Sequence, residues 1–233
     1  MDGRVRASKA LFAKHYLFGE LSPEQLDQLL ARARVERYRA GQSIFLNQSQ
    51  GRSMMAVLTG QVRISTMSRD GRELVLNTIL PGEVFGELAL LDGKERTADA
   101  VAVIASELLV LERNDFIPFI EKHPAVAMRL LEIITGRLRQ TTLQAADVAL
   151  LGLEARLAKQ ILTLATRYGE ATKDGTVITA KFTQRQLGQM IGASRESVNK
   201  QMVEWQRRGI AIIKGGLVTV RNVGALRRIA EGD

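Results

Sequence analysis

The spacing of apolar residues changes along this 233-residue chain. Residues 8–35 have helical periodicity, and Ser22-Pro23-Glu24 predicts the start of a helix there. From about Tyr38 to Leu111, short apolar runs alternate with turns that contain glycine. These runs are Ser43–Leu46, Met55–Leu58, Val62–Ser65, Leu74–Ile79, Ala100–Val103 and Leu108–Leu111. The pattern predicts many short strands in a small antiparallel β-barrel or jelly roll.

A long helical pattern then extends from Pro124 to about 150. Its apolar positions follow a 3-4 spacing, which is a heptad repeat, at Leu131, Ile134, Leu138, Thr141, Ala145 and Val148. Two interpretations fit such a stripe: a helix that pairs with a second copy of the chain, or a helix that packs on its own barrel. The heptad spacing favours the dimer, and both interpretations can hold on different faces.

Gly152 interrupts the helical pattern, so we expect one domain over residues 1–150 and another over 151–233. A helix from Leu153 to about Tyr168 begins the second domain. It is followed by a helix, a turn, a helix, and two strands, Ile210–Lys214 and Leu217–Val220, joined by a Gly-Gly hairpin turn. A short helix, Gly224–Ala230, ends the chain. The predicted fold class is α+β, with an N-terminal β-barrel and a C-terminal winged helix-turn-helix.

Positive charge is concentrated in the second domain. Residues 151–233 contain 14 Lys/Arg and 7 Asp/Glu, a balance of +7, whereas residues 1–150 contain 19 and 18, a balance of +1. A basic surplus confined to one domain predicts a polyanionic partner for that domain. With 45% hydrophobic and 25% charged residues, the composition is otherwise ordinary for a globular protein.

The chain has no cysteine, which excludes disulfides, thiolate zinc sites and cysteine-ligated iron–sulfur clusters. His15 and His123 are too few for a histidine-built metal site, so we expect no metal, haem or iron–sulfur cluster. No apolar run of about 18 residues predicts a membrane span. The start of the chain lacks the apolar core of a signal peptide, so the expected location is cytoplasmic, with no membrane partner.

A candidate ligand site lies in the segment Phe85 to Ala98. Gly86 lets a phosphate approach the backbone, and Arg96 offers a planar fork of donors for two phosphate oxygens. Thr97 adds a hydroxyl beside it. Glu87 would repel a phosphate, so its expected task is to accept a hydrogen bond from a sugar hydroxyl. Phosphate and ribose together indicate a nucleotide, and a single arginine suits a single negative charge.

A candidate DNA-reading helix lies in the second domain. Thr183 is expected to cap a first helix from Gln184, and Ser194 is expected to cap the second. Gly188 allows the two helices to approach closely, and Gly192 suits the left-handed conformation of the turn.

The second helix has an apolar face, with Val198, Met202 and Trp205, and an outward face. The outward face carries Arg195, Glu196, Asn199 and Lys200. An arginine can donate to guanine O6 and N7, and a glutamate can accept from cytosine N4. The pattern therefore predicts sequence-specific binding to double-stranded DNA, with Trp205 in the core.

These two segments carry a resemblance to a known family. Pro81–Leu90, followed by Glu95-Arg96-Thr97-Ala98, resembles the phosphate-binding cassette of cyclic-nucleotide-binding domains. Over roughly residues 20–225 the chain resembles the cyclic AMP receptor branch of the CRP/FNR transcription regulators. The resemblance implies that Arg96 and Thr97 bind the cyclic phosphate and that Glu87 binds the ribose 2′-hydroxyl. The full predicted ligand set is Gly86, Glu87, Leu88, Arg96, Thr97, Ala98, Thr141 and Thr142.

Thr141 and Thr142 come from the segment RLRQTT, which matches the family segment that contacts the base. By that resemblance, Thr141 bonds the adenine from the same subunit, and Thr142 reaches across a homodimer. Cyclic AMP is therefore the expected ligand. Cyclic GMP is the alternative, because Arg-Thr-Ala also resembles cyclic-GMP-binding domains, where the threonine hydroxyl meets the guanine 2-amino group.

Ser-Arg-Glu-x-x-x-Lys at 194–200 is similar to the recognition-helix motif of the same family. It implies an allosteric, ligand-dependent dimer on a pseudo-palindromic site, with half-sites about one helical turn apart. RNA polymerase is the further implied partner. The loop Arg167–Thr176 lies where the family's activator touches the polymerase, but its residues are not specific enough to carry that contact over. The full predicted DNA set is Lys181, Thr183, Gln184, Ser194, Arg195, Glu196, Asn199, Lys200 and Lys214.

Other functions stay open at this stage. The same fold could sense haem or redox state, but the absence of cysteine argues against this. A nucleotide hydrolase would need a metal constellation or an activated nucleophile beside Glu87, and neither is visible, so we expect no enzyme. The chain could instead regulate a partner protein. Gly152 at the hinge, which removes a helix cap, could also permit DNA binding without nucleotide.

Overall fold

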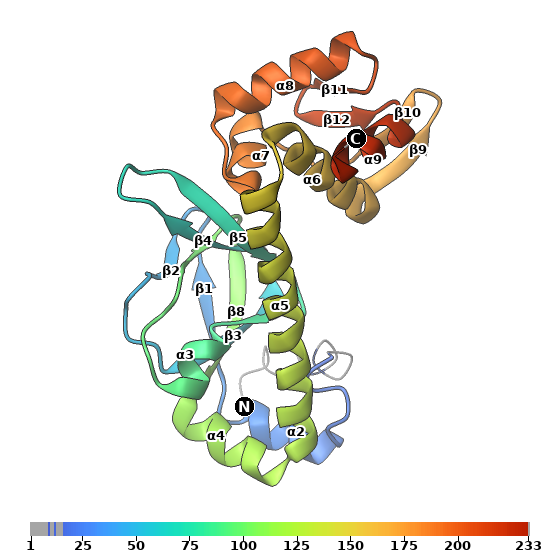
Figure 1. Cartoon of the computed structure of the whole chain (residues 1–233). Helices are drawn as coiled ribbons and strands as arrows, with labels where there is room; N and C mark the ends of the chain where they lie inside the picture. Colours follow the sequence, from blue (N-terminus) through green and yellow to red (C-terminus); the bar gives the residue numbers. More distant parts are fainter. Residues whose placement is uncertain (1–8, 10–11, 13–15, 233) are drawn as a thin grey trace. The chain divides into compact units, whose positions relative to one another are not determined.

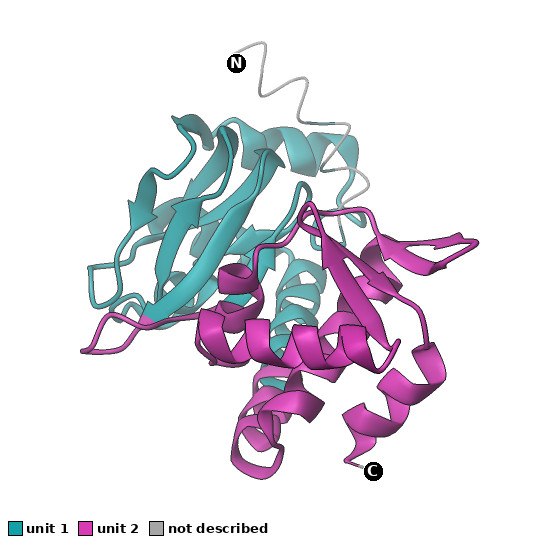
Figure 2. Ribbon diagram, turned by 90° about the horizontal axis from the view of Figure 1, so that it is seen from above, with its two compact units in different colours: residues 1–66, 76–139 teal, residues 67–75, 140–233 magenta. Residues whose placement is uncertain are grey.

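The structure is a computed structural model that describes residues 9, 12 and 16–232. Most of the N-terminal segment considered for a signal peptide, and His15, lie outside the described residues. Two compact units are distinguished in Figure 2. The N-terminal unit comprises residues 1–66 and 76–139, and the C-terminal unit comprises residues 67–75 and 140–233.

The N-terminal unit contains short helices and most of two four-stranded antiparallel sheets (Figure 1), of which only residues 67 and 73–75, at two strand ends, are grouped with the C-terminal unit. One sheet has the order β1-β8-β3-β6 and the other β2-β7-β4-β5. The strands are β1 (Arg34–Tyr38), β2 (Ser43–Phe45), β3 (Ser53–Thr59), β4 (Val62–Met67), β5 (Glu73–Ile79), β6 (Val84–Phe85), β7 (Asp99–Ala102) and β8 (Ser106–Glu112). The helices are α2 (Pro23–Leu30), α3 (Glu87–Asp92), α4 (Arg113–Lys122) and the first half of α5 (Pro124–Leu150).

The first sheet is covered on both faces, which explains its unbroken apolar runs. Successive residues of a strand point to opposite faces. On β8, Leu109 and Leu111 belong to a core shared with the helices, whereas Leu108 and Val110 belong to a core shared with the second sheet. β3 alternates in the same way. Both cores therefore depend on this central sheet, and together they hold the segments that surround the ligand cassette.

Helix α5 is continuous from Pro124 to Leu150, close to the predicted bounds. Val126 and Leu130 are its buried residues. Positions of the heptad stripe further along the helix are exposed: Leu131 is 52% exposed, Leu138 is 64% exposed and Val148 is 53% exposed. The heptad stripe is therefore a largely uncovered apolar face in this single chain.

The C-terminal unit is a helix-turn-helix with a small sheet of order β11-β12-β10-β9. Its elements are α6 (Leu153–Tyr168), β9 (Gly169–Thr172), β10 (Gly175–Ile178), α7 (Gln184–Ile191), α8 (Arg195–Arg207), β11 (Ala211–Lys214), β12 (Leu217–Val220) and α9 (Val223–Glu231). Its core includes Leu157, Ile161, Val198, Met202 and Trp205. The predicted fold class, α+β with a strand-rich N-terminal part and a C-terminal winged helix-turn-helix, is confirmed, although the two N-terminal sheets do not close into a barrel.

Local sequence signals place most elements correctly. Ser22 caps α2 in a capping box with Gln25, and Gly215 and Gly216 both have positive φ in the β11–β12 hairpin. Other elements differ from the prediction. The helical periodicity of residues 8–35 overruns the start of β1, α4 lacks a sequence signal, and the expected loop Arg167–Thr176 contains the β9–β10 hairpin. No helix among the described residues has the length and apolarity to cross a membrane.

Candidate functional site

Gly86 directly follows strand β6 and is the glycine of the cassette in the N-terminal unit. Gly86 has φ of 79°, a left-handed conformation that side chains rarely adopt. A Cβ atom at this position would lie 2.6 Å from Nη1 of Arg96. Glycine is therefore required here for two reasons, the backbone conformation and the close approach of the arginine. This explains the cassette glycine through its neighbour Arg96.

Arg96 is the central residue of the cassette and is only 5% exposed. Its Nη1 donates to the Gly86 carbonyl at 2.8 Å, and its Nη2 donates to Ser53 Oγ at 3.2 Å. The guanidinium carbon lies 4.2 Å from the centre of the Phe45 ring. Its Nε is buried and has no hydrogen-bond partner within the described part of the chain. Burial lowers the pKa of the Arg96 guanidinium.

The backbone on both sides of Arg96 is fixed by the loop that follows β2. Arg96 N donates to the Ser49 carbonyl, and Gln48 N donates to the Arg96 carbonyl, both at 2.8 Å. In the same loop, a Cβ atom at Gly51 would lie 2.8 Å from Arg96 Nε and 2.4 Å from the Ala89 Cβ. Gly51 therefore leaves the space that the arginine side chain fills.

Glu87 is 4% exposed, and its charge is balanced by an arginine from α5. The Glu87 Oε2 atom lies 2.7 Å from Arg137 Nη1. Arg137 also donates to the Val84 carbonyl, so it contacts the strand directly before the cassette. Glu87 is paired directly with Arg137 and acts on Arg96 only through space. The three groups together have a formal charge of +1.

The other predicted ligand residues occupy varied environments. Ala98 is buried at 5% exposure, whereas Leu88 is 43% exposed and Thr97 is also exposed. Thr141 and Thr142 lie on α5 within the C-terminal unit, and both are exposed. Their contact with the base stays a prediction.

The helix-turn-helix in the C-terminal unit is fixed by local bonds. Thr183 Oγ1 accepts from Gln186 N at 3.2 Å, and Ser194 Oγ accepts from Ser197 N at 3.1 Å, so both predicted caps are present. Gly192 has φ of 66°, as expected for the turn. A Cβ atom at Gly188 would lie 2.5 Å from the Ala193 carbonyl oxygen, which explains the need for glycine at the closest approach.

Helix α8 has the two faces that its sequence predicts. Val198 and Trp205 are fully buried, and Met202 is 2% exposed. The Trp205 Nε1 atom donates to Glu154 Oε1 at 2.8 Å, so this ring is a core residue with a satisfied donor. On the opposite face the three side chains that the family resemblance implies as base readers, Arg195, Glu196 and Lys200, are exposed, as is Asn199.

The first turn of α8 determines the charge state of Glu196. Its own backbone N–H and the Ser194 hydroxyl lower the pKa of the Glu196 carboxyl. The carboxylate is therefore ionised at neutral pH and can only accept hydrogen bonds. Beside it, Asn199 Oδ1 accepts from Gln184 Nε2 at 2.8 Å, which joins the start of α7 to α8.

Lys181 lies beside the β11–β12 hairpin, residues 211–220, which is the wing of the winged helix-turn-helix. A Cβ atom at Gly216 would lie 3.6 Å from the Lys181 Cβ, and Phe182 N donates to the Gly216 carbonyl at 2.9 Å. Lys181 and Lys214, at the end of β11, are both exposed. The structure thus brings two predicted DNA-contacting lysines to neighbouring segments that are distant in the sequence.

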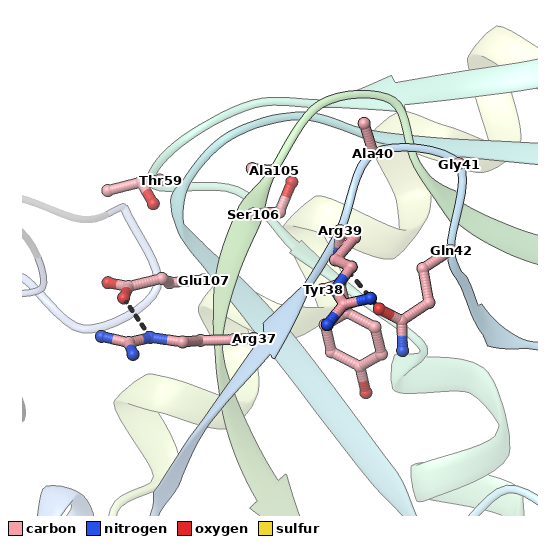
Figure 3. A pocket seen from close by; sticks show the side chains of 10 residues that line it. All are labelled: Arg37, Tyr38, Arg39, Ala40, Gly41, Gln42, Thr59, Ala105, Ser106 and Glu107. Carbon is pink, nitrogen blue, oxygen red and sulfur yellow. Dashed lines mark hydrogen bonds and ion pairs between the residues drawn. The ribbon is translucent and has the colours of Figure 1, made fainter.

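A groove elsewhere in the N-terminal unit is lined by other residues (Figure 3). It has a volume of about 1070 Å³ and lies at the turns between β1 and β2 and between β7 and β8. Its acid, Glu107, is paired with Arg37 at 2.8 Å. Most of its lining side chains are exposed, and it shares no residue with the cassette. We therefore assign it no role.

Known proteins match both parts of the chain. The family model "Cyclic nucleotide-binding domain" matches residues 35–123, and "Crp-like helix-turn-helix domain" matches residues 155–229. The "Cyclic AMP receptor protein" of Thermus thermophilus is 32% identical over 216 residues, which cover 93% of this chain and 97% of the relative. The chain belongs to the CRP/FNR family of transcription regulators. It is a cyclic-nucleotide-dependent transcription regulator, and this family is not one of enzymes.

Two further matches agree with this family. The "CRP-like cAMP-activated global transcriptional regulator" of Mycobacterium tuberculosis is 29% identical over 221 residues, covering 95% of this chain and 99% of the relative. A solved structure of the regulator CLP from Xanthomonas campestris, described as c-di-GMP responsive, has a TM-score of 0.77. It is 21% identical and covers 85% of this chain and 99% of its own, so it supports the fold alone.

The structure adds residues to the cassette that the sequence did not single out. They are Phe45, Gly51 and Ser53 around Arg96, and Arg137 beside Glu87. Arg137 lies in the segment RLRQTT, where no local pattern predicts its pairing with Glu87. Each contact joins residues far apart in the chain, so no local spacing predicts it.

Proposed function

We propose that cyclic AMP is the natural ligand and that its binding enables a homodimer to bind a pseudo-palindromic DNA site. The observation that carries this proposal is the buried guanidinium of Arg96, which has an unpartnered Nε among the described residues. Arg96 and Thr97 bind the cyclic phosphate, and Glu87, held by Arg137, accepts from the ribose 2′-hydroxyl. Leu88 and Ala98 line the sugar and phosphate positions.

The formal charge of +1 among Arg96, Glu87 and Arg137 supports a phosphodiester with one negative charge. A phosphomonoester carries two negative charges, and this group of three residues would balance only one of them. Thr141 and Thr142 contact the base. Two relatives are named for cyclic AMP, which supports that base over guanine. Cyclic GMP is the second candidate, because the exposed Thr97 hydroxyl offers an acceptor for a guanine amino group.

Homodimer formation is supported by the exposed apolar stripe on α5. Leu131, Leu138 and Val148 repeat at heptad-related positions and are each more than half exposed. Sedimentation should give twice the chain mass of 25.7 kDa. Leu131→Lys should favour the monomer, whereas Gln140→Lys, at an exposed position off the stripe, should leave the dimer intact. A monomeric wild-type chain would contradict the proposal.

Ligand and DNA are coupled through the dimer in this proposal. Such coupling is typically about 1–3 kcal/mol, and DNA then tightens ligand binding by the same factor. The boundary between residues 1–150 and 151–233 lies at the hinge beside Gly152. We further propose RNA polymerase as a partner, and the cytoplasm as the location, because the DNA is there.

Calorimetry with cyclic AMP and cyclic GMP, each on the purified chain, tests the ligand. Selection of DNA sequences with and without the tighter ligand then tests the regulator. We expect tighter binding of cyclic AMP and a palindromic consensus that depends on it. Binding of neither nucleotide would overturn the ligand proposal. An equal consensus and affinity without nucleotide would favour constitutive DNA binding, which the glycine at position 152 would explain.

A further inference from the structure

The environment of Arg96 presents a physical problem. A guanidinium that leaves water loses hydration, and burial lowers the pKa of Arg96 accordingly. Proteins usually compensate a buried cation with a carboxylate. Around Arg96 the nearby carboxylates already have other partners: Glu87 pairs with Arg137 at 2.7 Å, and Glu112 pairs with Arg34 at 2.5 Å.

The groups that touch the Arg96 guanidinium are instead neutral. They are the Phe45 ring at 4.2 Å, the Ser53 hydroxyl at 3.2 Å and the Gly86 carbonyl at 2.8 Å. An aromatic face carries partial negative charge and attracts a cation without a formal charge of its own. A hydroxyl and a carbonyl accept hydrogen bonds in the same way. The cation is thus stabilised while its full charge remains available to an anion.

We propose that Phe45 and Ser53 are positioning residues for the ligand, which hold the Arg96 guanidinium in a fixed plane without neutralising it. A carboxylate in either place would compete directly with the ligand phosphate. This inference rests on the proposed function, because it assumes that the anion bound by Arg96 is the cyclic phosphate. It adds that the ligand affinity depends on an aromatic ring and a hydroxyl beside the phosphate-binding arginine.

The position of each residue is fixed by the fold. Phe45 ends β2, and its ring also lies 5.9 Å from the ring of the buried Phe85, next to Gly86. Ser53 begins β3 and is 9% exposed. The backbone carbonyl of Ser53 would lie 3.3 Å from a Cβ atom at Gly86. The Phe45 ring, the Ser53 hydroxyl and the Gly86 carbonyl therefore lie at the ends of three different strands. The two sheets bring these strand ends together around the Arg96 side chain.

Substitution of the ring gives the first test, by calorimetry with cyclic AMP. Phe45→Leu removes the aromatic face, and a cation–π contact of this kind corresponds to a loss of about 3- to 30-fold in affinity. Phe119→Leu is the matched control, because Phe119 is also half-buried in the same unit but lies beside His123. The control should bind as the wild type does. Equal affinity of Phe45→Leu and wild type would overturn the role of the ring.

A graded test separates the electrostatic role from simple packing. Replacement of Phe45 by mono-, di- and trifluorinated phenylalanine keeps the shape of the ring and reduces the negative charge on its face. We expect the cyclic AMP affinity to fall stepwise with each fluorine while circular dichroism shows that the fold is retained. An affinity that is independent of fluorination would show that the ring only fills space.

The hydroxyl is tested with a pair of variants. Ser53→Ala removes the acceptor and should weaken cyclic AMP by about 2- to 10-fold, the range of a single hydrogen bond. Ser53→Thr keeps the hydroxyl and should retain most of the affinity. If both variants lose affinity equally, the hydroxyl does not position Arg96. A wild-type chain that binds neither nucleotide would overturn the proposed function itself. Normal binding by the wild type together with unaffected variants would overturn only the role of Phe45 and Ser53.

Discussion

Arg96 and Arg195 are the same residue type in opposite environments. Arg96 in the N-terminal unit is 5% exposed and is held by a carbonyl, a hydroxyl and a ring. Arg195 in the C-terminal unit is exposed at the start of α8. Arg96 loses little side-chain freedom when its anion binds, because its neighbours already hold it in place. Arg195 and the exposed side chains beside it must become ordered when they bind DNA.

The contrast extends to the way each unit treats its other charges. Several arginines of the N-terminal unit are paired with carboxylates, among them Arg34 with Glu112 and Arg137 with Glu87. In the C-terminal unit, Lys181, Lys214 and Arg195 are exposed. A small ligand with one charge needs one defined cation, whereas a duplex with a charge on every phosphate needs many. The net charge of each domain follows from this difference in the anion.

The largest difference that we expect between the two sites is in how strongly salt weakens their binding affinities. Exposed cations that neutralise phosphates release counterions from DNA, so specific DNA affinity should fall by about 10³-fold between 50 and 200 mM salt. Cyclic AMP affinity should change by only a few-fold, because Arg96 is buried and poorly screened. Fluorescence anisotropy for DNA and calorimetry for the nucleotide measure both. Equal salt dependence of the two affinities would contradict the comparison.

Arg96→Gln should weaken cyclic AMP by about 100-fold, because charged hydrogen bonds contribute about 1.5–3 kcal/mol each. It should also remove the effect of the nucleotide on specific DNA binding. Calorimetry measures the first effect and anisotropy the second. Gln184→Ala, remote from the cassette sequence and in the other unit, serves as the control for ligand affinity. Unchanged affinity in Arg96→Gln would show that the phosphate lies elsewhere.

Glu196→Ala should relax the preference at one C·G pair by about 1–3 kcal/mol, while total affinity changes less. The lowered pKa of Glu196 keeps this carboxylate ionised to a pH below its usual range, so the discrimination should persist from neutral to mildly acidic pH. Binding to a panel of single-base variants of the selected site measures it. An equal loss on specific and random DNA would instead indicate a general electrostatic or structural role.

Lys214→Gln should have the smallest effect, a nearly uniform loss on all DNA sequences with a salt slope reduced by about 1 for each copy of the chain. Lys181→Gln should behave alike, because Lys181 lies beside the same wing. Lys173→Gln, an exposed lysine in the β9–β10 turn, provides the comparison and should leave the slope unchanged. A sequence-dependent loss in Lys214→Gln would assign base reading to the wing.

Local signals in the sequence predict much of the C-terminal unit. The caps Thr183 and Ser194 and the Gly215-Gly216 hairpin lie where residue chemistry predicts them. Each depends on bonds between residues at most a few positions apart, which a single stretch of sequence contains. The β9–β10 hairpin is not predicted, because the four residues of β9, Gly169–Thr172, are all exposed and form no apolar run.

From the sequence alone, Gly86 and Arg96 are predicted to bind a phosphate, Glu87 is predicted to accept from a sugar hydroxyl, and α8 is predicted to have a buried and an outward face. The tertiary structure alone decided what surrounds these residues. Ser53 lies 43 positions before Arg96 in the chain, and Arg137 comes from a different helix than Glu87. Such contacts depend on the packing of two sheets and a helix, and no spacing along one segment encodes them. The motif predicts which residue binds the anion, and the fold determines which neighbours hold that residue in place.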